Sequence, residues 1–254
     1  MAKGRVGAKE LRRDPLMEQY ITTSSWIKTR TRPILTGLTV VAVIAAAILI
    51  FWQITSRRER AAADALSEAF KVTEAVVANP LPPNATGYAF TTEEEKDRKI
   101  FEAFDKVAHD YPSYYGDLAR FYAASSQLKF DPPAAEVTLK DLATRDSSVG
   151  AQAKFALAQR YEGSGRLDES LTTLQDLLKK PGDLAPLVIR FTIARVYDAQ
   201  GKTKEAADAY FEIAKDARSV GIGAVAMAKL SALDPARLDQ LPAPEASSPL
   251  AGFR

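Results

Sequence analysis

An uncharged apolar segment near the N-terminus, Ile34–Ile54, limits what this chain can fold into. As a helix its 21 residues would measure about 30 Å, which is the thickness of the hydrocarbon core of a bilayer. Trp52 lies at one end of the segment and Trp26 a little before the other, where aromatic rings suit the membrane–water interface. A buried core helix is usually shorter and keeps a polar face, so we expect a transmembrane helix over residues 34–56.

A cleaved signal peptide is the alternative for the same segment. The apolar core of a signal peptide is usually shorter than this segment, and the basic region before it is shorter than the 33 residues that precede Ile34. The small residues that resemble a cleavage site, Ala61–Ala63, come only after Arg57, Arg58 and Arg60. We therefore expect an anchor that stays in the protein.

The expected span separates a short basic tail, residues 1–33, from a large and slightly acidic domain. The tail contains eight Lys or Arg residues and three acidic residues. Basic residues favour the cytosolic side, whereas long domains cross the membrane largely regardless of their charge. The numbers of basic residues close to the span are nearly equal on its two sides, so these numbers alone do not decide the orientation. The short basic tail favours a cytosolic N-terminus and a domain on the opposite side of the membrane.

Composition and motifs argue against an enzyme. The chain has no cysteine and one histidine, which excludes disulfides, cysteine-bound metals and most catalytic triads. That histidine, His109, lies near an expected helix end, where it suits the helix dipole. The sequence Gly201-Lys202-Thr203 resembles the end of a phosphate-binding loop, but Val196 stands where that loop needs its first glycine. No basic patch with interleaved aromatic residues is present. We therefore expect no catalytic, metal or cofactor site, no small-molecule substrate and no nucleic-acid partner.

Helix signals recur along the whole domain after the span. Alanine-rich residues 61–78 are expected to continue the membrane helix, and three prolines within residues 79–88 are expected to end it. Thr92 and Glu95 form a capping box at the next helix start. Further helix starts are expected at Asp131-Pro132, at Ser147-Ser148 and at Asp234-Pro235. No segment alternates with the period of two that is typical of a half-buried strand, so the domain is predicted to be all-α.

The domain contains a repeat with an offset of 36 residues. Residues 153–181 align with residues 189–218, and each unit is a helix closed by a glycine, a tight turn and a second helix. The aligned pairs are Phe155 and Phe191, Ala158 and Ala194, Tyr161 and Tyr197, Gly165 and Gly201, and Leu174 and Tyr210. This pattern resembles the tetratricopeptide (TPR) repeat, which pairs two antiparallel helices over about 34 residues. Small residues let the two helices approach, aromatic residues fill the space between repeats, and glycine permits the turn.

Two looser units precede the two clear ones. Tyr115–Tyr122 begins one of them, and residues 61–78 with Ile100–Val107 form the other. Residues 57–240 are therefore expected to form the repeat domain, followed by a flexible tail over residues 241–254. The predicted fold class is all-α, with one N-terminal transmembrane helix followed by a TPR-like right-handed α-solenoid of antiparallel helix pairs.

A basic tail, one span and a degenerate helical-repeat domain form a layout that is similar to that of the bacterial YfgM family. Its members are TPR-like proteins anchored in the inner membrane. The resemblance implies a single-pass protein of the bacterial inner membrane with its repeat domain in the periplasm. It also implies the SecYEG translocon and periplasmic chaperones as partners. The proline-rich insertion at residues 79–88 and the 39-residue spacing between Tyr122 and Tyr161 depart from the family's pattern.

The first helices of TPR-like pairs line a concave groove, and the register of this repeat places seven residues toward it. They are Arg120, Phe155, Gln159, Glu162, Phe191, Arg195 and Asp198. Aromatic rings and arginines among polar residues suit extended peptide segments. A strong alternative is that Phe155 and Phe191 form the core between repeats. The expected function is a non-enzymatic, membrane-anchored adaptor that binds proteins. The alternative is a structural scaffold for outer-membrane or cell-wall assembly that makes its contacts through the convex face.

Overall fold

The structure, a computed structural model, describes three stretches of the chain, namely residues 31–81, 87–217 and 221–242. Most of the predicted basic tail (residues 1–30) and of the predicted C-terminal tail (residues 243–254) lies outside these described residues. The chain divides into two compact units, Met1–Ala61 and Ala62–Arg254, which are described separately below.

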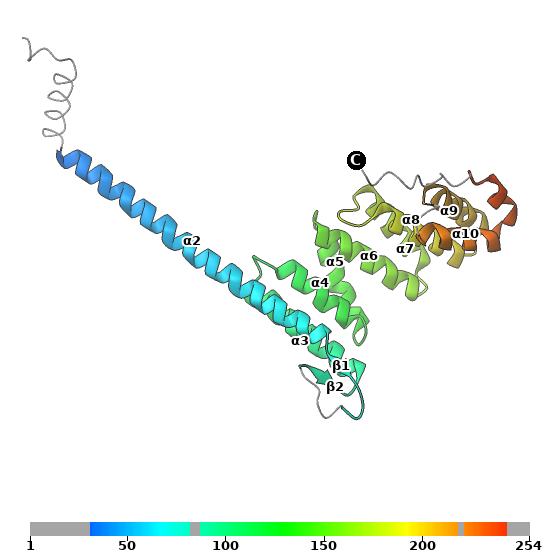
Figure 1. The fold of residues 1–254 in the computed structure, drawn as a ribbon, viewed down its shortest axis with the longest axis horizontal. Coiled ribbons are helices and arrows are strands. Elements are labelled where there is room, and N and C mark those ends of the chain that lie inside the picture. Colours follow the sequence, from blue (N-terminus) through cyan, green and yellow to red (C-terminus); the bar gives the residue numbers. More distant parts are fainter. Residues whose placement is uncertain (1–30, 82–86, 218–220, 243–254) are drawn as a thin grey trace, which may run out of the picture. The chain divides into compact units, whose positions relative to one another are not determined.

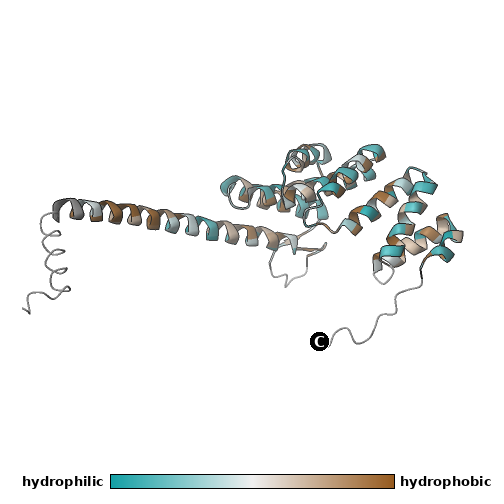
Figure 2. Cartoon of the chain, turned by 90° about the horizontal axis from the view of Figure 1, so that it is seen from above, coloured by the Kyte–Doolittle hydropathy of each residue, from teal (hydrophilic) through white to brown (hydrophobic). Residues whose placement is uncertain are grey.

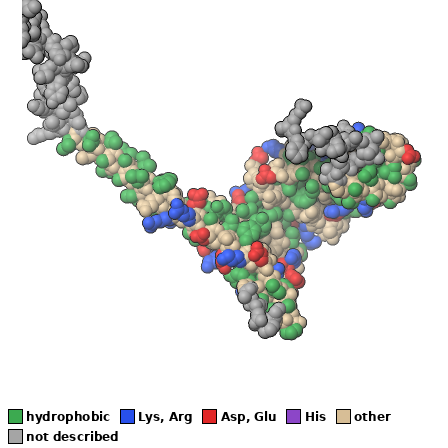
Figure 3. Space-filling model, viewed as in Figure 1, with side chains coloured by type: hydrophobic (Ala, Val, Ile, Leu, Met, Phe, Trp, Pro, Cys, Tyr) green, Lys and Arg blue, Asp and Glu red, His purple; other side chains and the backbone are tan. Residues whose placement is uncertain are grey.

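The first unit contains the larger part of helix α2, which begins at Thr31 and ends at Thr73 (Figure 1). Residues 35–54 of this helix are all exposed, and Phe51 and Trp52 expose 70% and 67% of their surface. Figure 2 colours this stretch as hydrophobic, and Figure 3 shows basic side chains after it. Exposed apolar surface is unfavourable in water, at roughly 25 cal/mol per Å². Among the described helices, α2 is the one that is long and apolar enough to cross a membrane, and it is compatible with a single span.

The second unit begins with the last turns of α2, which pack against helix α3 (Glu93–Asp110). Leu66 and Ala69 of α2 share a buried cluster with Phe104 and Val107 of α3. The ring of Phe70 meets that of Phe104 edge to face, with 5.1 Å between the centroids. The first degenerate helix pair that the sequence predicts is therefore present.

The connection between α2 and α3 corrects the prediction that the helix continues to Ala78. Helix α2 ends at Thr73, and strand β1 (Val76–Val77) pairs in parallel with strand β2 (Ala89–Phe90). Two consecutive β-branched residues favour extended backbone over helix, and the pairing brings the two ends of the proline-rich insertion together. Apart from this pair, the described residues form helices, turns and loops, so the predicted all-α class is confirmed.

Helices follow one another through the rest of the unit and lie side by side in chain order (Figure 1). They are α4 (Gly116–Gln127), α5 (Pro132–Ala143), α6 (Ser148–Gly163), α7 (Leu167–Lys179), α8 (Pro186–Ala199), α9 (Thr203–Asp216), α10 (Gly221–Leu233) and the 3₁₀ helix η2 (Pro235–Gln240). Each helix packs against the next, and α4 also contacts α6 as α8 contacts α10. We call α4, α6, α8 and α10 the A helices and α3, α5, α7 and α9 the B helices.

Side-chain caps confirm three of the predicted helix starts. Thr92 accepts from the Glu95 N–H at 3.1 Å, Asp131 from the Ala134 N–H at 3.3 Å and Ser147 from the Gly150 N–H at 3.1 Å. The capping box differs in one detail, because the Glu95 carboxylate accepts from the N–H and hydroxyl of Thr91. Asp234 precedes a 3₁₀ helix and its side chain makes no capping bond. Gly165 and Gly201 have φ values of 79° and 70°, which explains why glycine stands at both repeat turns.

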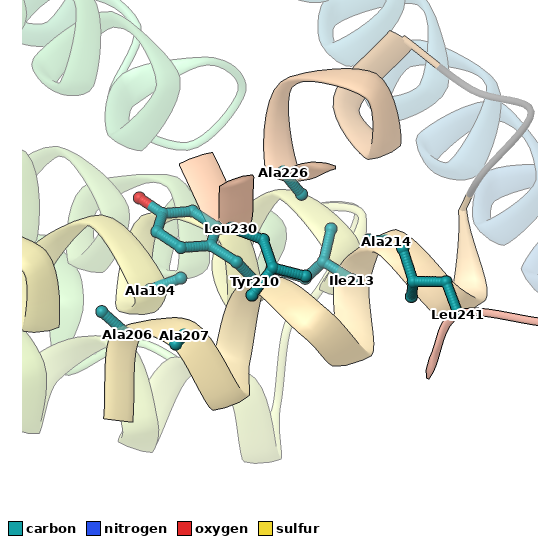
Figure 4. Close-up of a cluster of buried hydrophobic side chains, with 9 residues drawn as sticks. All are labelled: Ala194, Ala206, Ala207, Tyr210, Ile213, Ala214, Ala226, Leu230 and Leu241. Carbon is teal, nitrogen blue, oxygen red and sulfur yellow. The ribbon is translucent and has the colours of Figure 1, made fainter. Parts of the chain in front are cut away.

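One large side chain in each B helix is fully buried at the same position of the repeat. These side chains are Phe104, Leu139, Leu174 and Tyr210. They are 35 or 36 residues apart, so the B-helix register is kept through the degenerate units as well as the clear ones. Figure 4 shows the last of these clusters, in which Tyr210 lies among small residues such as Ala194 of α8 and Ala206 of α9. Leu241 also belongs to this cluster, so the packed part of the domain reaches that residue.

A charged cluster joins α5 to the start of α7. The Glu136 side chain, which is 13% exposed, accepts two hydrogen bonds from the Arg166 guanidinium and lies 2.8 Å from the Lys140 ammonium. The Arg166 guanidinium also lies over the ring of Tyr161, 4.2 Å from its centroid. The hydrogen bonds from Arg166, followed by those from Lys140, lower the pKa of Glu136 to about 2 although burial opposes them.

This pKa predicts an acid-sensitive contribution to stability. The folded pKa of Glu136 lies below its ordinary value of 4.5, so its stabilisation is complete above pH 4.5 and is lost as the pH falls toward 2. We expect Glu136→Gln to lower the free energy of unfolding by on the order of 2 kcal/mol at pH 7, and this difference to shrink by pH 3. Urea unfolding of both proteins across this range measures it. The control is Glu169→Gln, because Glu169 also pairs with Arg166 but is more exposed. If the difference between Glu136→Gln and the wild type did not change with pH, the low pKa of Glu136 would be contradicted.

Candidate protein-binding face

The seven predicted groove residues all lie on A helices, Arg120 on α4 and the other six on α6 and α8. The structure brings two of them into direct contact. The Arg195 guanidinium donates to both carboxylate oxygens of Glu162, at 2.7 and 2.6 Å. This two-fold hydrogen bond raises the pKa of Arg195, which therefore stays protonated. The Arg195 side chain is 44% exposed and that of Glu162 is 17% exposed, so the arginine faces solvent more than its partner does.

A second ion pair continues from α8 to α10. Asp198 lies one helical turn after Arg195, and its carboxylate is 3.4 Å from the Lys229 ammonium. Lys229 is a residue that sequence reasoning missed, because the aligned repeat ends before α10. Its position in the sequence could have indicated it, because Lys229 follows Asp198 by 31 residues and Arg195 follows Glu162 by 33. We call Glu162, Arg195, Asp198 and Lys229 the charged ladder.

Arg120 lies apart from the charged ladder. Its guanidinium is 2.8 Å from the Asp141 carboxylate of α5 and 4.0 Å from that of Asp117 on its own helix. The hydrogen bond from Arg120 lowers the pKa of Asp141. Arg145 also approaches Asp141, at 3.6 Å, so Arg120 belongs to a separate charged group at the α4–α5 contact.

Phe155 and Phe191 are both half-buried, and both pack against the core between repeats. Phe155 lies against the cluster formed by α6, α7 and α8. Phe191 lies edge to face with Tyr210, with 5.7 Å between the ring centroids. Both rings therefore make the contacts of core residues, and part of the surface of each remains exposed. Gln159 is exposed and lies three residues before Glu162, which places both on one face of α6.

Tyr210 places a polar atom in the buried cluster that α8, α9 and α10 share. Its side chain is fully buried, and its hydroxyl makes no hydrogen bond to any residue that the structure describes. Burial, followed by the negative charge of Asp198, raises the pKa of Tyr210 to about 12, while Arg195 acts in the opposite direction. The hydroxyl is therefore a neutral hydrogen-bond donor at physiological pH. The sequence presents Tyr210 as a core residue of the repeat, and nothing in the repeat pattern marks its hydroxyl as functional.

Two pockets in the described part of the chain lie apart from the seven predicted residues. A pocket of about 390 Å³ lies at the N-terminus of α6, and one of about 280 Å³ lies between α3 and the last turns of α2. None of the seven predicted residues, all of which the structure describes, lines either pocket. Within the described stretches, no three His, Cys, Asp or Glu side chains converge as a metal ion requires.

Comparison with known proteins gives one match. The model of a family described as "Tetratricopeptide repeat-like domain" matches residues 25–235, a range that contains the predicted span and the helices from α2 to α10. No curated protein and no solved structure matches the chain.

Proposed function

The chain belongs to the tetratricopeptide repeat-like domain family, and from this we propose that it is a membrane-anchored adaptor that binds other proteins. Stacked helical repeats form extended surfaces that serve protein–protein contacts, generally without catalysis. The observation that carries the proposal is the charged ladder on the A-helix face. Its arginine presents a planar donor to solvent, and the half-buried Phe191 lies about one helical turn before it on α8.

The ion pair between Arg195 and Glu162 leaves the arginine accessible to a partner, because the Arg195 side chain is 44% exposed. The bond to Glu162 uses two of the five N–H donors of the Arg195 guanidinium, so the others remain for a group on a bound protein while the ion pair stays in place. The partner then gains a charge-assisted hydrogen bond in a fixed geometry. A partially exposed ring such as Phe191 adds apolar contact beside it.

The proposed place of action is the periplasmic face of a bacterial inner membrane. The exposed apolar part of α2 supports anchoring, and the basic residues before it support a cytosolic N-terminus. A reporter enzyme that works only outside the cytosol, fused after Phe253, is expected to be active. Activity of a reporter that works only in the cytosol would overturn this orientation.

A link to protein translocation or chaperoning is the narrower form of the proposal. It rests on the layout that the chain shares with YfgM-like proteins, which is one span followed by degenerate helical repeats. The partners it suggests are the SecYEG translocon and periplasmic chaperones.

Charge reversal of one arginine tests the role of the A-helix face. We expect Arg195→Glu in the full-length, membrane-embedded protein to lower recovery of crosslinked partners about tenfold, which corresponds to about 1.4 kcal/mol. Arg190→Glu is the matched control, because Arg190 lies on the same helix and pairs with Asp216 of α9. Equal losses in both variants, or none, would contradict binding through this face. An unchanged Arg195→Glu variant would favour the scaffold alternative, with contacts through the B helices.

A further inference from the structure

Three arginines follow the apolar part of α2 within one helical turn, and none of them pairs with an acidic residue in the described part of the chain. They are Arg57, Arg58 and Arg60, and all three are exposed (Figure 3). Along the described length of α2, an ion pair joins Lys71 to Glu68, about three turns further on. The three guanidiniums therefore have N–H donors available for a group outside the chain.

The position of the three arginines on α2 corresponds to the headgroup layer of a bilayer. At 1.5 Å per residue, Arg57 lies about 4.5 Å and Arg60 about 9 Å beyond Ile54 along the helix. The headgroup layer on each side of the hydrocarbon core is roughly 5–8 Å thick. With the apolar segment in the core, long arginine side chains at this height reach the lipid phosphates.

The three arginines also lie on one side of the helix. At 3.6 residues per turn they cover an arc of about 160°, and Glu59 lies on the opposite side. The arginine side therefore presents positive charge without an acidic neighbour on the same turn.

We propose that Arg57, Arg58 and Arg60 bind the phosphates of phospholipids whose headgroups have a net negative charge, such as phosphatidylglycerol. The inference rests on the proposed membrane anchoring. Each guanidinium is a planar fork that can donate two parallel N–H bonds to one phosphate. Anionic lipids then gather at the arginine side of α2.

The local charge selects this class of lipid. Three arginines and Glu59 give this turn of the helix a net charge of +2. The phosphate of a zwitterionic lipid is balanced by the ammonium group of its own headgroup, whereas that of phosphatidylglycerol is not. An acidic protein is the other source of negative charge, but it would have to enter the headgroup layer to reach the three arginines.

The orientation proposed for the chain gives a second reason. Basic residues next to a span favour the cytosolic side of the membrane. Arg57, Arg58 and Arg60 follow the span, so they lie on the side proposed to be outside the cytosol and oppose that orientation. They also add no ion pair to the described fold. Contact with anionic lipid explains why three unpaired cations stand at this place.

The test measures which lipid gathers around Trp52. It uses the full-length chain with Trp26→Phe, so that Trp52 is the remaining one of the two tryptophans. Trp52 lies about 7.5 Å along the helix from Arg57, and 67% of its surface is exposed. Phosphatidylcholine bilayers contain equal amounts of either acyl-brominated phosphatidylglycerol or acyl-brominated phosphatidylcholine, because bromine quenches a nearby tryptophan. We expect quenching to show a preference for phosphatidylglycerol of about fivefold, which one cation at an anionic surface supplies.

Removing the three charges should remove the preference. We expect Arg57→Gln, Arg58→Gln and Arg60→Gln together to bring the ratio close to one, while helix α2 is kept because glutamine has nearly the helix propensity of arginine. The matched control changes the net charge equally at three exposed lysines of other helices and should keep the fivefold ratio. Its substitutions are Lys106→Gln, Lys179→Gln and Lys204→Gln.

Equal quenching by the two lipids in the wild type would overturn the inference. An unchanged ratio in the arginine variant, or an equal fall in the arginine and lysine variants, would overturn it as well. Equal quenching together with fewer crosslinked proteins in the arginine variant would assign the arginines to an acidic protein instead. Failure of the proposed anchoring gives a different result, because neither brominated lipid would then quench Trp52.

Discussion

Replacing Gly150 with alanine is expected to lower the free energy of unfolding of the repeat domain by about 3 kcal/mol. A Cβ at this position would lie 2.1 Å from the backbone oxygen of Arg145 and 3.2 Å from that of Leu142. The Leu142 oxygen belongs to the last turn of α5 and the Arg145 oxygen to the α5–α6 junction, and this backbone has to shift to make room. Urea unfolding followed by circular dichroism measures the change, and thermal unfolding should show a midpoint on the order of 10 °C lower.

The matched control for this change is Gly163→Ala in the same helix. Apart from its chain neighbours and the backbone of its own helix, no atom lies within 4 Å of a Cβ built at Gly163, so alanine is expected to be neutral or to stabilise by roughly 0.5 kcal/mol through its higher helix propensity. Similar stability of the two variants would contradict the close packing of α6 against the α5–α6 turn.

Phe104→Ala is expected to cost about 3–5 kcal/mol, because it removes a fully buried ring and leaves a cavity. The Phe104 ring lies edge to face with Phe70 at 5.1 Å and stacks on Tyr122 at 5.0 Å. These three rings join the end of α2, α3 and α4. The variant should therefore loosen the first helix pair, which limited proteolysis at the α2–α3 connection detects together with urea unfolding.

An exposed apolar residue provides the comparison for Phe104. Val137 is 70% exposed, so Val137→Ala should change stability by less than about 0.5 kcal/mol. If Phe104→Ala were as mild as this control, the last turns of α2 would not form part of the repeat core.

Much of the fold follows from local signals in the sequence. Thr92, Asp131 and Ser147 cap helices where their side chains predict it, because an N-cap depends on a few neighbouring residues. The 36-residue offset gives the helix pairs, since the same apolar positions must meet in each repeat. The apolar helix near the N-terminus follows from composition and length alone.

The features that could not be predicted from the sequence depend on contacts between segments far apart in the chain. Strands β1 and β2 pair across the proline-rich insertion, and the sequence of either two-residue strand does not indicate that it pairs with the other. The pairing of Arg120 with Asp141 separates it from the other predicted groove residues. Lys229 joins the ladder from a helix beyond the aligned repeats. The unpaired hydroxyl of Tyr210 becomes visible only when all of its neighbours are known.

Site-specific photocrosslinking in intact membranes tests most directly whether the A-helix face binds proteins. Benzoylphenylalanine is placed either at Gln159, exposed on α6 beside the charged ladder, or at Thr172, exposed on α7. Crosslinks to partner proteins from position 159, weakened by Arg195→Glu and missing from position 172, are the predicted result. Crosslinks from position 172 with none from position 159 would contradict the account.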